Sequence, residues 1–418
     1  MSVLQPSKWL GILLFLMIPL ILFSQTKKPN TATKRCHTDQ KMQLAMDADP
    51  AYKKAIENDL EKPKNSNFNT FGKNSSIVII IPVHVIICHP PGQSVGTGVN
   101  FSLAHVESQI TVLNEDFRRT NSDAGNTPNV FPAADVEIEF CLASVDPNGN
   151  PTDGITRYGT NQNLSSNENA IKSATGWDRD DYLNIWVGPN LGGILGWAYL
   201  PSTNNLPNAT LDGVVTASTT FGGPGYGTNN PYHLGRTTTH EVGHYLGLRH
   251  VWGNGGCSSD DNIADTPIQS SSNFGCPSHP SPSCNNGGDM FMNYMDYVND
   301  NCMNAFTTGQ GDRMHVILNN SRSSLLASAA IVCNVGVPLA LELVGQTNPT
   351  CFGGDNGTIT ILGSGGTGNF TYNINSGAPQ SSNIFVGLTA GTYIVEVDDG
   401  SNTISMNVTL TEATEVIP

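Results

Sequence analysis

The chain has 418 residues, and its 20 lysine and arginine residues against 35 aspartate and glutamate residues give a formal net charge of −15. This length exceeds that of one typical domain, so two or three modules are expected. The negative charge argues against a protein that binds the phosphate backbone of nucleic acids. Nine cysteines are an odd number, so at least one of them does not pair within the chain.

The first residues have the pattern of a secretory signal peptide. Lys8 precedes an apolar run over residues 9–23. An uncleaved membrane anchor is the rival interpretation, but Gly11 and Pro19 interrupt the run, which is short for a spanning helix. We expect a signal peptide over residues 1–24, no other segment that crosses a membrane, and a secreted, extracellular protein that other contacts can hold at the cell surface.

The next segment, residues 25–74, is polar and rich in lysine, with one weak helical stretch over residues 51–60. A segment of this composition has little apolar core of its own. It contains a single cysteine, Cys36, whose thiolate is a good metal ligand. We expect this segment to precede the first folded domain without forming one.

A domain of fold class α+β is expected over residues 75–335. Its first strand, residues 77–87, is apolar on both faces and is therefore predicted to be buried. A helix over residues 102–117 follows, because apolar residues recur there at helical spacing behind a Ser102 cap. The remaining expected elements are strands near residues 136–142 and 183–187, the helix that carries the motif described next, and a last helix over residues 310–326.

Residues 240–250 read HEVGHYLGLRH, which is the zinc signature HExxH extended to a third histidine. On a helix, His240 and His244 share one face and reach a single ion. A continued helix would carry His250 about 15 Å along the axis, far beyond a zinc–nitrogen bond of about 2.0–2.1 Å. The helix is therefore predicted to end and the chain to turn back at Gly247.

Three histidines leave one position of a tetrahedral zinc ion open, which is typical of a catalytic rather than a structural site. Glu241 lies beside the ligands as a general base, which accepts a proton from the zinc-activated water and passes it to the leaving amine. A HExxH pair alone is a weak signal, and His250 makes a later glutamate ligand unnecessary. The sequence predicts one catalytic Zn²⁺ ion held by His240, His244 and His250.

The stretch after this motif is rich in glycine and asparagine and has too little apolar content to fold by itself. Its four cysteines, Cys257, Cys276, Cys284 and Cys302, are expected to form disulfides, since export permits oxidation. Four cysteines allow three pairings, and the sequence does not choose among them. A second zinc site is the alternative, but the stretch lacks the spacing of such sites. The states of four further cysteines stay open: Cys88, Cys141, Cys333 and Cys351.

Residues 260–266, DDNIADT, offer carboxylates, a hydroxyl group and backbone carbonyls within seven residues. Calcium takes six to eight oxygen ligands, and such a loop supplies many of them. A polar loop whose aspartates cap helices is the alternative interpretation.

The character of the sequence changes after the α+β domain. Residues 343–418 contain runs of alternating polarity over residues 358–361, 370–374 and 404–410, separated by glycine, asparagine and serine turns. This pattern predicts a small antiparallel all-β sandwich of the immunoglobulin-like kind.

Over residues 75–330 the chain resembles the pappalysin (cytophagalysin) family of metzincin zinc peptidases. The resemblance implies a metzincin-type catalytic domain with a twisted sheet and an active-site helix. Residues 292–297, MNYMDY, resemble the Met-turn beneath the zinc ion, which implies Met295 as the Met-turn residue, with Met292 as the competing register, and Tyr297 as a tyrosine near the metal. The other matching motifs are residues 106–119, 138–143, 154–157, 183–187, 196–199, 212–215, 265–267 and 306–310.

The same resemblance implies further site residues. It implies structural Ca²⁺ in the 260–266 loop, with Asp261, Thr266 and Asp265 as ligands. It also implies the disulfide pairs Cys257–Cys284 and Cys276–Cys302.

The resemblance also implies roles for Cys36, which precedes the zinc motif, and for Asp300, which follows it. Residues 35–38, RCHT, resemble the cysteine motif in the pro-segments of latent metalloproteases, although His37 stands where glycine is commoner. Cys36 is then expected to occupy the open zinc position until residues 25–74 are cut away, with a carboxylate such as Asp39 or Asp47 as the alternative zinc ligand. Asp300 is expected at the pocket for the residue after the scissile bond, where it would favour arginine or lysine; a surface aspartate is the alternative.

Residues 351–357 and 388–393 of the predicted sandwich resemble a repeat of the cell-surface adhesins of gliding bacteria. The sequence therefore predicts a secreted, latent zinc endopeptidase that acts on proteins or peptides and touches a cell surface or matrix through this module. The alternatives are an adhesion or binding protein on a non-hydrolytic metzincin scaffold and a structural surface protein stabilised by calcium.

Overall fold

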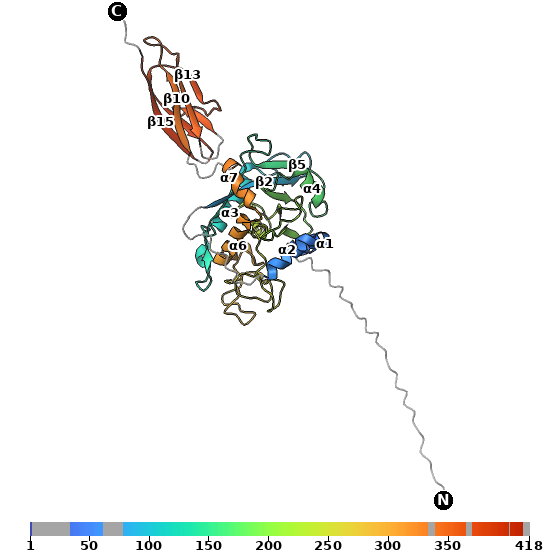
Figure 1. The fold of residues 1–418 in the computed structure, drawn as a ribbon. Coiled ribbons are helices and arrows are strands. Elements are labelled where there is room, and N and C mark those ends of the chain that lie inside the picture. The colour runs from blue at the N-terminus through green and yellow to red at the C-terminus, as the bar shows by residue number, and fades with distance from the viewer. Residues whose placement is uncertain (2–33, 62–77, 333–338, 365–369, 401, 413–418) are drawn as a thin grey trace, which may run out of the picture. The chain divides into compact units, whose positions relative to one another are not determined.

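The computed structural model describes residue 1 and residues 34–61, 78–332, 339–364, 370–400 and 402–412 (Figure 1). The expected signal peptide and its cleavage point lie outside these residues. Among the helices of the described residues, none combines the length and the apolar character needed to cross a membrane.

The central domain, residues 79–332, is built on a mixed sheet. The strand order is β1-β7-β8-β6-β2-β4, and β5 also pairs with β2. All of these pairs are parallel except that of β7 with β8. The strands are β1 (Lys34–Cys36), β2 (Ile79–His89), β4 (Ile138–Leu142), β5 (Ile155–Gly159), β6 (Leu183–Gly188), β7 (Ile194–Ala198) and β8 (Val214–Ala217).

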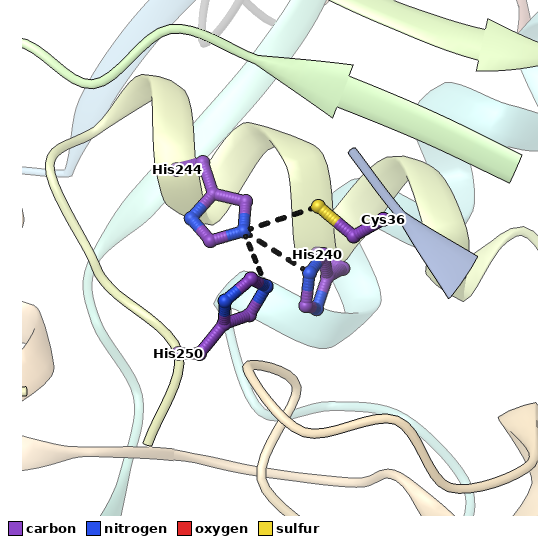
Figure 2. Close-up of side chains that lie close together, drawn as sticks. All are labelled: Cys36, His240, His244 and His250. Atoms are coloured by element: carbon purple, nitrogen blue, oxygen red, sulfur yellow. Dashed lines mark hydrogen bonds between the residues drawn. The ribbon is translucent and has the colours of Figure 1, made fainter. Parts of the chain in front are cut away.

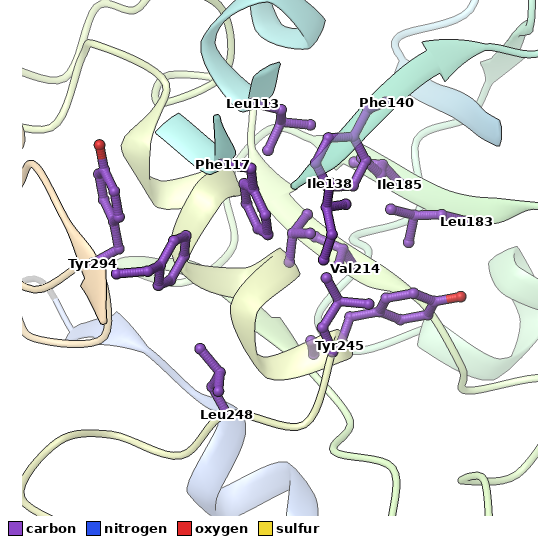
Figure 3. Close-up of a cluster of buried hydrophobic side chains, with 14 of the residues drawn as sticks. Leu113, Phe117, Ile138, Phe140, Leu183, Ile185, Val214, Tyr245, Leu248 and Tyr294 are labelled. Carbon is purple, nitrogen blue, oxygen red and sulfur yellow. The ribbon is translucent and has the colours of Figure 1, made fainter. Parts of the chain in front are cut away.

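Strand β2 is buried on both faces, in agreement with its continuous apolar sequence. One face places Val83 and Val85 in the main core. Figure 3 shows part of this core, including Leu113 of a covering helix. The other face places Ile86 in a second cluster that contains Trp186. Strand β2 therefore lies inside the sheet, between β6 and β4.

The helices of this domain are α3 (Leu103–Phe117), α4 (Glu168–Thr175), α5 (Arg236–Tyr245), α6 (Thr308–Asn319) and α7 (Ser323–Val332). Helix α3 begins behind Ser102 as predicted, and the Ser102 hydroxyl accepts a hydrogen bond from the backbone N–H of His105 at 3.3 Å. The remaining short elements are two 3₁₀ helices at Ala124–Asn126 and Asp300–Cys302 and the strand pair β3 (Ala133–Ala134) and β9 (Phe306–Thr307).

The prediction of one last helix over residues 310–326 is wrong, because the chain breaks there into α6 and α7. Arg322 stands just before α7 and is 1% exposed. Its guanidinium donates to the carbonyl of Tyr245 at 3.0 Å and pairs with Asp212 at 2.7 Å. This distant ion pair fixes the break, and nothing in the local apolar spacing signals it.

The N-terminal segment, residues 34–61, has more structure than the sequence predicted. It contains two helices, α1 (Thr38–Ala48) and α2 (Pro50–Glu61), drawn in blue in Figure 1. The weak helical stretch corresponds to α2, whereas α1 was not predicted. Met42, Tyr52 and Ile56 are buried in the second apolar cluster, alongside residues of the central domain. The segment is thus helical through docking rather than through a core of its own.

Residues 339–412 form two three-stranded antiparallel sheets, β10-β11-β13 and β12-β14-β15. Their inner faces share one apolar cluster, to which Ile359 and Ile361 contribute from one sheet and Val395 and Val408 from the other. The predicted small sandwich is therefore present. Its strands are β10 (Ala340–Thr347), β11 (Gly357–Ser364), β12 (Thr371–Ile374), β13 (Ile384–Leu388), β14 (Gly391–Asp398) and β15 (Thr403–Leu410).

Candidate metal centre

Helix α5 carries His240, Glu241 and His244, all of which are buried. The helix ends at Tyr245, and Gly247 follows with a backbone φ of 88°, a left-handed conformation that glycine adopts without strain. The chain turns there and brings His250 back to the two helical histidines.

Backbone carbonyls fix the orientation of the two helical imidazoles. Nδ1 of His240 donates to the carbonyl of Tyr294 at 2.7 Å, and Nδ1 of His244 donates to the carbonyl of Leu248 at 2.7 Å. Since a carbonyl only accepts, each Nδ1 carries the ring proton and each Nε2 presents a lone pair. Burial lowers the pKa of both histidines, so both rings are neutral and each could bind a metal ion through Nε2.

The ligand atoms of four residues converge on one point (Figure 2). Nε2 of His244 lies 3.1 Å from Nε2 of His240, 3.1 Å from Nε2 of His250 and 3.5 Å from Sγ of Cys36. A tetrahedral zinc ion with bonds of about 2.0–2.1 Å to nitrogen and about 2.3 Å to sulfur separates its nitrogen ligands by about 3.3 Å and nitrogen from sulfur by about 3.5 Å. Lone pairs that face each other this closely need a cation between them. The donor set therefore fits zinc.

The Glu241 carboxylate lies beside these ligands. Its Oε2 accepts hydrogen bonds from the Cys36 thiol at 3.5 Å and from the Thr38 hydroxyl at 3.2 Å. Its Oε1 is buried and has no hydrogen-bond partner. Burial raises the pKa of Glu241 to about 8. Strand β7 passes so close that a Cβ on Gly196 would lie 2.7 Å from the Glu241 side chain, so glycine is required there.

Two residues of the expected Met-turn lie next to this centre. A Cβ added to Gly243, between the two helical ligands, would lie 2.5 Å from Sδ of Met295, so Met295 packs directly against the helix. Met292, the competing register, is also buried. The hydroxyl of Tyr297 lies 3.1 Å from Nε2 of His250, which places this tyrosine beside the ligands.

The N-terminal segment enters the centre along the edge of the sheet. Strand β1 pairs with β7, with Cys36 opposite Gly196. Asp39, the alternative ligand considered from the sequence, instead lies with its Oδ2 3.1 Å from Nδ1 of His250, on the side of the ring away from the other ligands. Cys36, rather than Asp39, thus takes the position that completes the set of four.

Asp300 is fully buried, so it is not the surface aspartate of the alternative interpretation. Its Oδ1 lies 3.1 Å from Nη2 of Arg35, and its Oδ2 accepts the backbone N–H of Leu234 at 2.9 Å. The other Arg35 nitrogen, Nη1, donates to the carbonyl of Val298 at 2.7 Å. A guanidinium of the N-terminal segment is therefore paired with the buried Asp300 carboxylate.

The residues that hold Asp300 and the N-terminal segment in place were not predicted from the sequence. Arg236, the first residue of α5, donates to the carbonyls of Asp300 at 2.8 Å and Met303 at 2.5 Å. Lys41 lies 2.5 Å from Glu168, on α4. These contacts join residues that are far apart in the chain, so no motif signals them.

Of the three predicted calcium ligands, Asp261 and Thr266 contact each other and Asp265 lies apart from them. Both oxygens of Asp261 accept from the Thr266 hydroxyl, at 2.8 and 3.0 Å, and burial raises the pKa of Asp261. Asp265 turns away from them and accepts from the Thr307 hydroxyl and the N–H of Gly309 at the start of α6. Asp265 therefore contacts the first turn of α6, whose N-cap is Thr307.

The cysteines of the same region are joined as Cys257–Cys284 and Cys276–Cys302, with Cα–Cα distances of 5.2 and 5.6 Å. Cys141 is also disulfide-bonded. The free cysteines among the described residues are Cys36, Cys88 and Cys351.

The chain is similar to known proteins in sequence and in structure. Residues 165–319 match the family model described as pregnancy-associated plasma protein-A, and residues 344–379 match the SprB repeat. The chain is 46% identical over 221 residues to an extracellular metalloprotease of Arthroderma benhamiae, covering 51% of this chain and 70% of that protein. It is 34% identical over 276 residues to an extracellular metalloprotease of Colletotrichum graminicola, covering 64% of this chain and 86% of that protein. The match to a relative from Arthroderma otae spans 54% of that protein's length, at 47% identity and 35% of this chain.

Two solved structures share the fold. A promirolysin mutant of Tannerella forsythia superimposes with a TM-score of 0.61 at 39% identity, covering 72% of this chain and 99% of that chain. Mature mirolysin of the same organism, in complex with a cleaved peptide, superimposes with a TM-score of 0.53 at 45% identity, covering 60% of this chain and 95% of that chain. The predicted α+β metzincin-type fold is thereby confirmed.

Proposed function

We propose that the chain, which belongs to the peptidase family of pregnancy-associated plasma protein-A, acts as a zinc metalloendopeptidase in which His240, His244 and His250 hold the zinc ion and Glu241 is the general base. The observation that carries this assignment is the convergence of three imidazole Nε2 atoms that present lone pairs to one point. Because the relatives are named extracellular metalloproteases, we also propose that the enzyme acts outside the cell on proteins or peptides.

Bound zinc supplies a Lewis acid that polarises the scissile carbonyl and makes water acidic enough to be deprotonated near pH 7. The chain's own residues do the rest. Glu241 accepts the water proton at its carboxylate and passes it to the leaving amine. Tyr297 donates a hydrogen bond to the oxygen that gains charge, or holds the ligand set in place.

The test of this assignment separates the base from the ligands. Glu241→Ala is expected to abolish hydrolysis of a peptide library while the protein keeps one zinc ion, because the variant loses no ligand. His250→Ala is expected to lose both zinc and activity. Zinc content by atomic absorption and cleavage by mass spectrometry are the measurements. Near-normal turnover by Glu241→Ala would remove the mechanism and favour another base.

We further propose that the N-terminal segment is a pro-segment that keeps the enzyme latent through Cys36. Support comes from the 3.5 Å distance of its sulfur from His244 Nε2 and from three charged side chains that dock the segment. These are Arg35 at Asp300, Lys41 at Glu168 and Asp59 at Arg313. Maturation then requires a cut after the segment and its release.

Asp300 is proposed as the residue that selects arginine or lysine after the scissile bond. Arg35 of the segment supports this role, since its guanidinium already pairs with the Asp300 carboxylate in a buried pocket. A buried carboxylate without a partner is costly, so the emptied pocket favours a substrate cation.

Two further roles concern the calcium loop and the C-terminal sandwich. The buried Asp261 carboxylate, with Thr266, is proposed to take part in a calcium site, because a cation offsets the cost of burying that charge. The SprB-like sandwich is proposed to contact a cell surface or matrix. The alternative of a non-hydrolytic scaffold is disfavoured by Glu241, which a purely structural zinc site does not need.

A further inference from the structure

The carboxylate of Asp59, on α2 of the N-terminal segment, is held by donors of the central domain. Its Oδ2 accepts the backbone N–H of Thr203 at 2.6 Å, and its Oδ1 accepts the Thr203 hydroxyl at 2.7 Å. Nη2 of Arg313 lies 3.2 Å from Oδ2. A cation, an N–H and a hydroxyl group around two oxygens form a complete carboxylate site.

The central domain itself holds one of these donors, the guanidinium of Arg313. Nε of Arg313 donates to the carbonyl of Gly247 at 3.3 Å, so the central domain itself orients the guanidinium. The Arg313 side chain is 13% exposed, and its burial works against the charged form while Asp59 favours it. Release of the segment therefore leaves a preorganised cation that has lost its partner.

The carboxylate site opens into the space next to the metal centre. A cavity of about 430 Å³ is lined by His244, Gly247, Arg249 and Arg313 of the central domain, and it is closed on its other side by residues of α1 and α2. It therefore extends from a zinc ligand to the Asp59 site. Removal of the segment converts this cavity into an open groove.

The contacts at the two ends of helix α5 indicate whether this groove binds substrate residues before or after the scissile bond. Arg236, at the start of α5, holds the loop of Asp300, whereas Arg313 contacts Gly247, just beyond the end of α5. The zinc ligands lie between them. If Asp300 faces the residue after the scissile bond, Arg313 faces residues before it.

We propose that Arg313 and Thr203 form a subsite for an acidic side chain on the N-terminal side of the scissile bond, which Asp59 fills in the precursor. The inference rests on the proposed function, since it requires a peptidase from which the segment has been released. Arg249, in the same groove, adds a second positive charge to its lining.

The test uses peptides that carry arginine after the cut and glutamate or glutamine at each of the four preceding positions in turn. Processed enzyme is expected to cleave one glutamate peptide about tenfold faster than its glutamine partner, the effect of one set of charge-assisted hydrogen bonds. Arg313→Gln is expected to reduce this ratio to about one. Arg118→Gln removes an arginine from the far end of α3 and is expected to keep the ratio of the parent.

A binding measurement separates this subsite from the reaction. Glu241→Ala protein, freed of the segment by limited proteolysis, is titrated with the same peptides by calorimetry. The glutamate peptide is expected to bind about tenfold more tightly. A parent that treats glutamate and glutamine alike, in cleavage and in binding, overturns the subsite, as does a preference that survives Arg313→Gln. If the Glu241→Ala protein binds the glutamate peptide more tightly but the processed parent cleaves neither peptide, the proposed function is contradicted and the subsite stands.

Discussion

The N-terminal segment and the C-terminal sandwich flank the same peptidase domain in the sequence, yet they are stabilised in opposite ways. Met42 and Tyr52 of the segment are buried in a cluster with Trp197 and Leu200 of the peptidase domain. Apolar side chains of the sandwich, such as Ile361, are buried in a cluster of sandwich residues. The segment buries its apolar side chains against the peptidase domain, whereas the sandwich buries its apolar side chains against one another.

This difference predicts different consequences of mutation. Because the segment is held by side chains around the metal centre, a change in it alters activity before it alters stability. Because the sandwich encloses its own core, a change there alters the stability of that module and leaves the metal centre as it was. Mutations in the segment, the peptidase domain and the sandwich can therefore test whether the two flanking regions are stabilised differently.

The largest effect is expected from Cys36→Ala in the uncut precursor. If Cys36 supplies one of four zinc ligands, its share of a binding free energy of about 10–16 kcal/mol is about 3 kcal/mol, or more than about a hundredfold in the rate at which the precursor cleaves a peptide. Cys351→Ala, the same change at the free cysteine of the sandwich, is expected to leave the precursor silent. A Cys36→Ala precursor as silent as its parent would argue that Arg35 and Asp39 suffice for latency.

A pH effect is expected in the peptidase domain through His84. This side chain is fully buried between Asn184 and Thr156, and burial lowers its pKa to about 4. The unfolded chain binds a proton below about pH 6.5 and the folded domain does not, so stability falls as the pH drops from about 6.5 to about 4. The loss at pH 5 is about 2 kcal/mol.

The measurement is the urea midpoint of the peptidase transition at pH 7.5 and pH 5, for the parent and for His84→Gln. The matched variant is needed because other groups oppose the effect: burial raises the pKa of Asp116 to about 6, which adds stability as the pH falls. The variant is expected to be less stable at pH 7.5 but to change less with pH. The sandwich, which has no histidine in residues 339–412, is expected to show no loss in this pH range. Equal pH dependence of parent and variant would mean that His84 protonates without unfolding.

A smaller effect is expected at the pocket that the segment fills. Asp300→Asn removes the charge that pairs with Arg35. Processed enzyme is expected to cleave a peptide with arginine after the cut at least tenfold faster than its leucine partner, about 1.4 kcal/mol, and Asp300→Asn is expected to remove this preference. Asp289→Asn, in the neighbouring loop, serves as the control. An arginine preference that persists in Asp300→Asn would show that another group sets the charge of the pocket.

The features that could be predicted from the sequence are those that depend on residues close together in the chain. His240 and His244 are predictable because helical spacing alone places them on one face, and His250 because one glycine turn brings it back. The buried strand β2 and the sandwich follow from apolar patterns over a few residues. All of these depend on neighbours in the chain.

What the sequence did not reveal depends on partners far along the chain. Helix α1 was missed because its apolar residues are few, and Met42 gains a core only by docking. The break between α6 and α7 depends on the ion pair of Arg322 with Asp212. The contact of Asp265 with the first turn of α6 was not predicted either, since the two lie far apart in the sequence. Such contacts carry no local pattern.

The smallest effect is expected from the loss of one methylene group in the sandwich core, compared with the same loss in the peptidase core. Ile361 is fully buried within the sandwich cluster, and Ile361→Val removes one methylene group, which costs about 1 kcal/mol. In a module of this size the melting temperature falls by about 4–8 °C. Ile185→Val, the same change in the main core of the peptidase domain, is expected to lower the peptidase transition instead. Scanning calorimetry of both variants resolves the two transitions. If either variant moves both transitions together, the sandwich does not unfold as an independent module, and its contrast with the segment is lost.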